Sequence, residues 1–503
     1  MIRKRGPCFR PPVTPSVILA CVAAYFAVLI GVAWWTGRAA GNEGYFRGNR
    51  RSPWVVVALG LIGDSLSGVS YISVPGKVAR DHFEYLAVVF GYALGYLVIC
   101  GILLPLYYRL GLTSIYGFLG QRFGPAAQKT GSGFFLLSRV FGSSARLLLS
   151  ITVFQTFVFD AWGVPFWTTA AVIIGLILIY TLQGGIKTLV WTDTIQSGFL
   201  VLGVVVCAGS LLQQLDIGPV DLLRMLRSAP ETAIYNGDWR SAGLFWKQLV
   251  SGAAIAVVMT GLDQNNMQKT LSCRTLSDAR KNFALFTPIM VLVNLAILVL
   301  GALLFRFAAE RGIGIPARTD ELFPRIALQH LGTSTAVVFL LGLTAATFNS
   351  ADSVLTTLTT SFCVDFLGFE QRKDLGEEAR VGLRRRVHVA FAGVLLATIL
   401  IFRSLADGLP LIDVVLKVAG YTYGPLLGLF FIGLATKVRV TGAVIPVVAL
   451  ASMFSAGLMD LAANRLFNGI RFGTELILIN ALMTGLGLVL CGRFQSRAVP
   501  RDC

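Results

Sequence analysis

The chain has 503 residues, of which 55% are hydrophobic and 14% charged, and its mean hydropathy is +0.72. Soluble domains carry about 25% charged residues, so this composition argues against a soluble enzyme. The net charge of +17 could suggest a nucleic-acid binder, but in so apolar a chain it is typical of a membrane protein with basic cytoplasmic loops. The eight cysteines and three histidines show no disulfide framework, metal-ligand spacing or hydrolase motif.

Apolar segments of the length that crosses about 30 Å of hydrocarbon recur thirteen times along the chain. In order they run over residues 16–37, 53–79, 85–108, 126–160, 165–183, 188–213, 242–265, 281–307, 334–364, 387–403, 409–433, 440–459 and 474–492. The first is too long for the apolar part of a signal peptide, so we expect a membrane helix there. No break in composition separates the segments, and we expect a single transmembrane domain over residues 1–503.

The distribution of basic residues predicts the orientation. Lys and Arg are more numerous in the loops that follow the odd-numbered segments and in the C-terminal tail. Cytoplasmic loops carry this excess, so we expect a multi-pass protein of the cell (inner) membrane, with its N-terminus outside and its C-terminus cytoplasmic. The N-terminal tail opposes this orientation with Arg3, Lys4, Arg5 and Arg10.

The second and seventh segments are poor continuous helices. The second places Gly, Pro and hydroxyl residues between Gly63 and Gly76, where a lipid-facing helix would have Leu or Ile, and the seventh ends in the polar run 260–266. Freed backbone groups at membrane depth need protein, water or an ion as partner, so paired breaks of this kind indicate a transport site. A packing face of small residues is the alternative.

The interval of five segments between the two breaks predicts two inverted repeats. The first would cover residues 53–213 and the second residues 242–433. Residues 16–37 would then form an extra N-terminal helix, and residues 440–492 two additional C-terminal helices.

Five stretches in chain order resemble the sodium:solute symporter family, whose core has a LeuT-like fold. They are Asp64–Gly76, Gly184–Gln196, Gly261–Leu271, Ala345–Ser353 and Gly420–Phe430. The resemblance implies an all-α membrane protein of about 13 transmembrane helices, with a LeuT-like 5+5 inverted repeat in which helices 2 and 7 are broken.

The resemblance also implies a sodium site where broken helix 2 meets helix 9. Its ligands would be the carbonyls of Gly63, Leu66 and Ala346 and the side chains of Asn349 and Ser350. Hard cations prefer oxygen ligands, and Asn349 supplies an amide oxygen where relatives usually have Ser or Thr. The alternative for Ser350 is a hydroxyl bonded to the carbonyl four residues earlier.

Some relatives hold a second cation near the first. Here the corresponding residues are Asp193, Asn349, Asp352 and Ser353. Two facing carboxylates repel unless a cation or a shared proton lies between them, and the sequence leaves both open. Asp193 could instead complement a helix N-terminus, and Asp352 could pair with Lys417 or Arg146.

Arg139 and Arg146 lie seven residues apart and therefore on one face of helix 4. We expect Arg146 deep in the membrane, where its guanidinium suits a carboxylate, and Arg139 near the cytoplasmic interface, where snorkelling is the alternative. The resemblance adds further candidate solute contacts, namely Ser70, Ser73, Thr260, Lys417 and Tyr421. Two positions that bind sugar hydroxyls in a galactose transporter are Ala256 and Met259 here, which favours an organic anion or an amino acid over a sugar.

The sequence thus predicts a sodium-coupled symporter that imports a small carboxylate-bearing solute by alternating access. Its expected partners are the solute, Na+ and the lipid bilayer, with no enzymatic activity, nucleic acid or protein partner expected. One alternative is a proton-coupled carrier that uses Asp193 and Asp352. Another is a membrane receptor that binds solute without transport, which a cytoplasmic signalling domain would mark.

Overall fold

The computed structural model describes residues 15–37, 41–228, 232–238, 241, 243–369, 371–372, 376–405, 411–440, 442–466 and 475–494. The α-helices are α1 (Pro15–Gly37), α2 (Asn42–Arg47), α3 (Trp54–Ser65), α4 (Gly68–Asp81), α5 (Tyr85–Val98), α6 (Leu104–Leu110), α7 (Gly117–Phe123), α8 (Pro125–Phe154), α9 (Phe166–Gln214), α10 (Pro219–Ser228), α11 (Phe245–Ala256), α12 (Gln264–Thr270), α13 (Leu276–Glu310), α14 (Leu322–Gln329), α15 (Thr333–Ser361), α16 (Glu377–Leu405), α17 (Leu411–Ala435), α18 (Val444–Leu466) and α19 (Leu476–Cys491). Short 3-10 and π turns are η1 (Gly48–Arg50), η2 (Ile99–Leu103), η3 (Gln155–Phe159), η4 (Asp160–Trp162), η6 (Val257–Gly261), η7 (Thr319–Glu321) and η8 (Phe362–Phe366). Strands β1 (Val438–Arg439) and β2 (Arg493–Phe494) pair antiparallel.

The prediction of an all-α membrane protein is confirmed. Among the described residues, nine helices are long and apolar enough to cross a membrane, or eleven if each of two bent pairs counts as one span. Two shorter apolar helices, Phe166–Leu182 and Leu476–Cys491, coincide with two further predicted segments. The count of thirteen transmembrane helices and the boundaries of the two repeats stay predictions.

Both predicted breaks are present. Helices α3 and α4 meet at a bend of 57°, and α11 with η6 meets α12 at a bend of 66°. The first break arises because Leu66 and Ser67 adopt extended backbone angles (φ −104°, ψ 92° and φ −82°, ψ 172°). At the second break Asp263 is extended (φ −107°, ψ 121°), and its carboxylate caps α12 by accepting a hydrogen bond from Asn265 N at 2.9 Å.

The fifth and sixth predicted segments both lie in α9 and are separated by a kink at Gly185 (φ 53°, ψ −145°). The apolar helices on either side of the kink run over Phe166–Leu182 and Gly184–Gln214, close to the two predicted segments. A Cβ atom at this position would lie 2.5 Å from the Tyr45 backbone, and the positive φ also favours glycine. The kink therefore lets α2 pack closely against α9.

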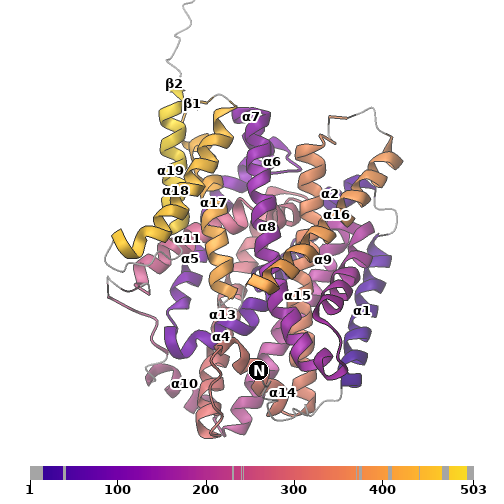
Figure 1. Ribbon diagram of the computed structural model, residues 1–503, viewed down its shortest axis with the longest axis vertical. Coiled ribbons are helices and arrows are strands. Elements are labelled where there is room, and N and C mark those ends of the chain that lie inside the picture. Colours follow the sequence, from indigo (N-terminus) through magenta and orange to yellow (C-terminus); the bar gives the residue numbers. More distant parts are fainter. Residues whose placement is uncertain are drawn as a thin grey trace, which may run out of the picture.

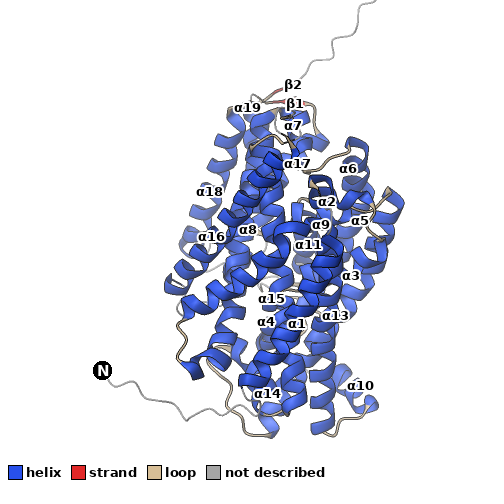
Figure 2. Ribbon diagram, turned by 90° about the vertical axis from the view of Figure 1, so that its right-hand side faces the viewer, coloured by secondary structure: helices blue, strands red, loops and turns tan. Residues whose placement is uncertain are grey.

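The helices run mostly along the long axis of the molecule, with α10 and α14 at one end and β1 and β2 at the other (Figures 1 and 2). At the centre, α9 and α15 pack against each other, and α3 and α12 pack against both. Large apolar side chains point outward on the peripheral helices, for example Trp35 (68% exposed), Leu461 (78%) and Leu490 (84%). Such surface is expected where a helix faces hydrocarbon.

Candidate functional site

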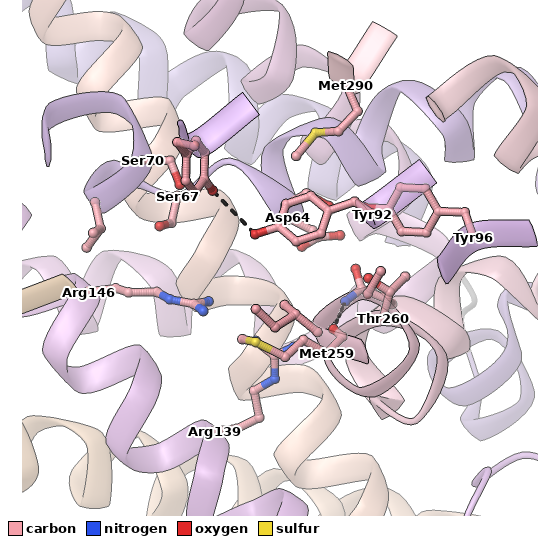
Figure 3. Close-up of a pocket in the computed structure, with 16 residues that line it drawn as sticks. Asp64, Ser67, Ser70, Tyr92, Tyr96, Arg139, Arg146, Met259, Thr260 and Met290 are labelled. Carbon is pink, nitrogen blue, oxygen red and sulfur yellow. Dashed lines mark hydrogen bonds between the residues drawn. The ribbon is translucent and has the colours of Figure 1, made fainter. Parts of the chain in front are cut away.

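A cavity of about 120 Å³ lies beside the break between α3 and α4. Its wall is built from that break, from three tyrosines of α5, from α8, and from α11 with the following π turn, and Met290 of α13 closes it (Figure 3). Tyr85 and Tyr92 are joined through their hydroxyls at 3.4 Å. The cavity thus combines aromatic faces with hydroxyls and charged groups, as small-molecule sites do.

Arg139 and Arg146 both line this cavity, so the predicted shared face of α8 is present (Figure 3). Arg146 reaches into the cavity, and it forms no hydrogen bond or ion pair with the residues that the structure describes. Tyr92 is close enough to interact with its charge. The Arg146 guanidinium is therefore a set of donors whose partner in the site is a ligand or solvent.

Arg139 differs from the expectation of a residue near the cytoplasmic interface. It is only 5% exposed, and its Nε and a terminal nitrogen both lie 2.7 Å from Asp263 Oδ2. The Tyr423 hydroxyl donates to the same oxygen. The ion pair explains why Arg139 is buried, because Asp263 lies at the break of helix 7 and contacts the arginine inside the protein. The pair leaves Arg139 less available to a solute than Arg146.

The other predicted solute contacts divide into two groups. Ser70 and Thr260 line the cavity, as do Ala256 and Met259. Ser73 and Tyr421 are not among the cavity-lining residues. Ser73 is fully buried, and Tyr421 donates a hydrogen bond to Asp460 Oδ2 at 2.6 Å. The side chain of Lys417 lies outside the described residues.

The predicted sodium ligands meet where α3 ends against α15. A Cβ atom added to Gly63 would lie 2.5 Å from Asn349 Nδ2, which shows how closely the two helices approach. The last backbone hydrogen bond of α3 runs from Leu66 N to Ile62 O. Within the described part of the chain, the carbonyls of Gly63 and Leu66 accept no backbone hydrogen bond, as expected at a helix end.

On α15, Asn349 has a buried side-chain oxygen without a hydrogen-bond partner. Its amide nitrogen donates to the Asp193 carbonyl at 3.3 Å, so the side chain is oriented by α9. The Ser350 hydroxyl donates to Ala346 O at 3.0 Å, which is the alternative considered for this residue. This bond leaves the lone pairs of the Ser350 oxygen free, whereas the Ala346 carbonyl accepts both the hydroxyl and the backbone N–H of its own helix. The five residues therefore come together, while their role as ligands stays a prediction.

The four residues of the predicted second cation site are all fully buried. Two of them, Asp193 and Ser353, contact a charge that the sequence analysis did not place, the ammonium of Lys269. Lys269 Nζ donates to Ser353 Oγ at 2.6 Å and also to Asp193 and Asp64, and the residue is 1% exposed. We call Asp64, Asp193, Asp352 and Lys269 the lysine–carboxylate cluster.

Asp352 does not pair with Arg146 in the described structure, and no side-chain contact of Lys417 is described. Asp352 Oδ2 accepts hydrogen bonds from the Tyr180 hydroxyl at 2.7 Å and from Gln196 Nε2 at 3.5 Å. Asp352 Oδ1 accepts one from Ser353 N at 2.6 Å. Asp193 lies well inside α9, and its Oδ1 has no hydrogen-bond partner. The carboxylates of the cluster are thus held by protein donors.

The sequence analysis missed Lys269, Asp64, Asp263 and Tyr180. A usable signal was present for the first three, since each lies in a stretch that carries the family resemblance, at or next to a predicted break. Charged residues at membrane depth are functional by default. No sequence feature indicated a role for Tyr180, because a single tyrosine in an apolar helix belongs to no recognisable motif.

Comparisons with known proteins agree with this architecture. The model of the sodium:solute symporter family matches residues 45–449. The human sodium/iodide cotransporter is 24% identical over 425 residues, which cover 82% of this chain and 64% of the relative. Sodium-coupled monocarboxylate transporter 2 of Danio rerio is 25% identical over 410 residues, which cover 78% of this chain and 63% of the relative. The chain thus spans less than two thirds of the length of these relatives.

A solved structure of a Na+-coupled sialic acid symporter, in a substrate-bound outward-open state, has the same fold. The TM-score is 0.82 at 17% sequence identity, and the match covers 95% of this chain and 99% of the other. This likeness confirms the predicted LeuT-like fold.

Proposed function

Because the chain belongs to the sodium:solute symporter family, we propose that it is a sodium-coupled secondary symporter that imports a small carboxylate-bearing solute by alternating access. In this proposal it lies in the cell (inner) membrane with its N-terminus outside and its C-terminus in the cytoplasm. Residues 16–37 form an extra N-terminal helix, and residues 440–492 form two additional C-terminal helices.

Sodium coupling is proposed mainly from the Asn349 side-chain oxygen, which has no hydrogen-bond partner and lies beside the C-terminal end of α3. A buried polar atom without a partner costs free energy unless a ligand or water satisfies it. The carbonyls of Gly63 and Leu66, which accept no backbone hydrogen bond among the described residues, belong to the same junction. The Ser350 hydroxyl and the Ala346 carbonyl would complete a set of neutral oxygens. Such a set suits a monovalent hard cation, which we propose is sodium.

We propose a carboxylate group on the solute because of Arg146. A guanidinium in a cavity binds a carboxylate with two parallel hydrogen bonds, and Arg146 has donors free for this. The relatives named above transport iodide and monocarboxylates, and the structural neighbour takes sialic acid, which are all anions. A volume of about 120 Å³ favours a small solute, and Ala256 and Met259 offer it no hydroxyl contacts.

Coupling would follow from the shared break. Asp64, Ser65 and Ser67 line the solute cavity, while Gly63 and Leu66 belong to the sodium junction, so the same few residues face both ligands. An ion that fixes the end of α3 fixes one wall of the cavity. By thermodynamic reciprocity, the solute then tightens sodium binding to the same extent.

The test starts from a screen of carboxylates by thermal stabilisation of the purified protein in sodium and in potassium. Uptake of a carboxylate that stabilises only in sodium is then measured in proteoliposomes under each gradient. We expect uptake in sodium and not in potassium. Equal uptake in both would refute sodium coupling. Uptake driven by a pH gradient alone would favour the proton-coupled alternative, for which Asp193 and Asp352 are the candidate groups.

A further inference from the structure

We propose that the ammonium of Lys269 occupies the place of the second cation, so that transport is coupled to one sodium ion. This inference rests on the proposed sodium-coupled function and specifies its stoichiometry. The ammonium, a fixed charge of the protein, would take the place of a second transported ion.

The geometry places the ammonium on the ligands that the second cation would use. Lys269 Nζ lies 2.6 Å from Ser353 Oγ and is hydrogen-bonded to Asp193 Oδ2, and Ser353 Oγ is itself 3.3 Å from Asp193 Oδ2. A sodium ion bound to these two oxygens would lie in contact with a group of the same charge. The buried site has no bulk water to screen that repulsion, so ammonium and ion exclude each other.

The fold explains how a lysine reaches this place. Helix α12 begins at the break of helix 7, and all of its residues from Gln264 to Thr270 are buried. It packs against α3, α9 and α15, and Lys269 in its last turn meets one carboxylate on each of the first two, Asp64 and Asp193. A straight helix 7 would not turn this segment into the core, so the 66° bend is what delivers the charge.

The contacts also give two of the three carboxylates of the cluster a shared cation. Asp64 and Asp193 each give one oxygen to Lys269, and Asp64 accepts a further bond from Asn265 at 3.3 Å. Among the described residues, no group of three or more His, Cys, Asp or Glu side chains is arranged to hold a metal ion. The neutral oxygens around Asn349 are then left as the site for the transported sodium.

The experiment counts bound sodium ions by equilibrium binding of ²²Na+ to the purified protein, with no solute needed. We expect one ion per wild-type chain. Two ions in the wild type would overturn the inference while leaving sodium coupling intact. No sodium binding would contradict the proposed function itself, so the two failures are distinguishable.

Variants test the role of the ammonium. In Lys269→Gln the carboxylates lose their cation, and we expect two ions per chain; one ion would overturn the inference. In the double variant Lys269→Gln/Ser350→Ala, which also weakens the first site, we expect about one. Lys269→Arg keeps the charge and serves as the matched control, with one ion expected.

If Lys269→Gln does not fold, the sodium count of the wild type still decides. The double variant Lys269→Gln/Asp64→Asn removes a carboxylate together with the ammonium, and we again expect it to bind two ions.

Discussion

Replacing Asp263 by Asn removes the charge that holds Arg139 inside the protein. The two side chains are joined through two nitrogens of Arg139 at 2.7 Å, and the exposed fractions of the side chains alone are 0% for Asp263 and 7% for Arg139. The loss of one partner of a buried ion pair costs about 3–5 kcal/mol, because the other charge stays desolvated without compensation. We therefore expect Asp263→Asn to lower the free energy of unfolding by about that amount.

The substitution isolates the charge because Asn caps helices about as well as Asp, so the start of α12 at Asn265 is preserved. Stability is measured by titration with a denaturing detergent in mixed micelles. The double variant Arg139→Gln/Asp263→Asn removes both charges and should recover most of the loss. The matched surface control is Asp221→Asn, since Asp221 and Arg224 are 60% and 76% exposed and such pairs contribute under about 1 kcal/mol.

A loss below about 1 kcal/mol in Asp263→Asn would refute the reasoning, because it would mean that Arg139 finds water or another partner in the cavity. An unchanged double variant beside a strongly destabilised single variant would support it. If Arg139→Gln alone abolishes solute binding without loss of stability, Arg139 belongs to the solute site instead.

Three further outcomes are expected. Ser350→Ala should weaken sodium affinity about tenfold without loss of folding, because one of about five oxygen ligands is lost; sodium titration of thermal stability measures it, and unchanged affinity would remove Ser350 from the site. Arg146→Lys should weaken binding of a carboxylate solute about 10- to 100-fold while the protein still inserts, because the charge stays and the paired hydrogen bonds are lost; normal binding in a solute titration would make Arg146 structural. Gly185→Ala should lower stability, because its Cβ atom would lie 2.5 Å from the Tyr45 backbone and φ is 53°; an unchanged unfolding curve would show that α9 can straighten.

The breaks were predictable because their causes are local. Gly, Pro and hydroxyl residues weaken the helix ladder wherever they occur, so the bends between α3 and α4 and before α12 follow from the residues there. The shared face of Arg139 and Arg146 was predictable for the same reason, since it depends only on the helix period. The approach of Asp193 to Ser353 came from the family resemblance and not from local pattern.

The charge pairing was not predictable, because it depends on contacts between distant segments. Lys269 meets Asp64 and Asp193, which lie 205 and 76 residues away in the chain. The position of Arg139 along its helix likewise did not show that Asp263 would neutralise it. As long as the acidic partner is unknown, a basic residue buried in an ion pair and one that snorkels to the interface look alike in the sequence.

In the proposed function, the pairing of charges would give the cavity and the junction preferences for ions of opposite sign. Asp263 neutralises Arg139, whereas Arg146 has no ion-pair partner among the described residues and is the cavity's available positive charge. Across the break of helix 2, the lysine–carboxylate cluster has three acids and one base, so its carboxylates favour a bound cation nearby. Two bound ions of opposite charge on the two sides of the break would attract each other, more strongly in this buried setting than in bulk water. Electrostatic attraction across the break can thus supply part of the coupling between sodium and an anionic solute, and a neutral solute would lack it.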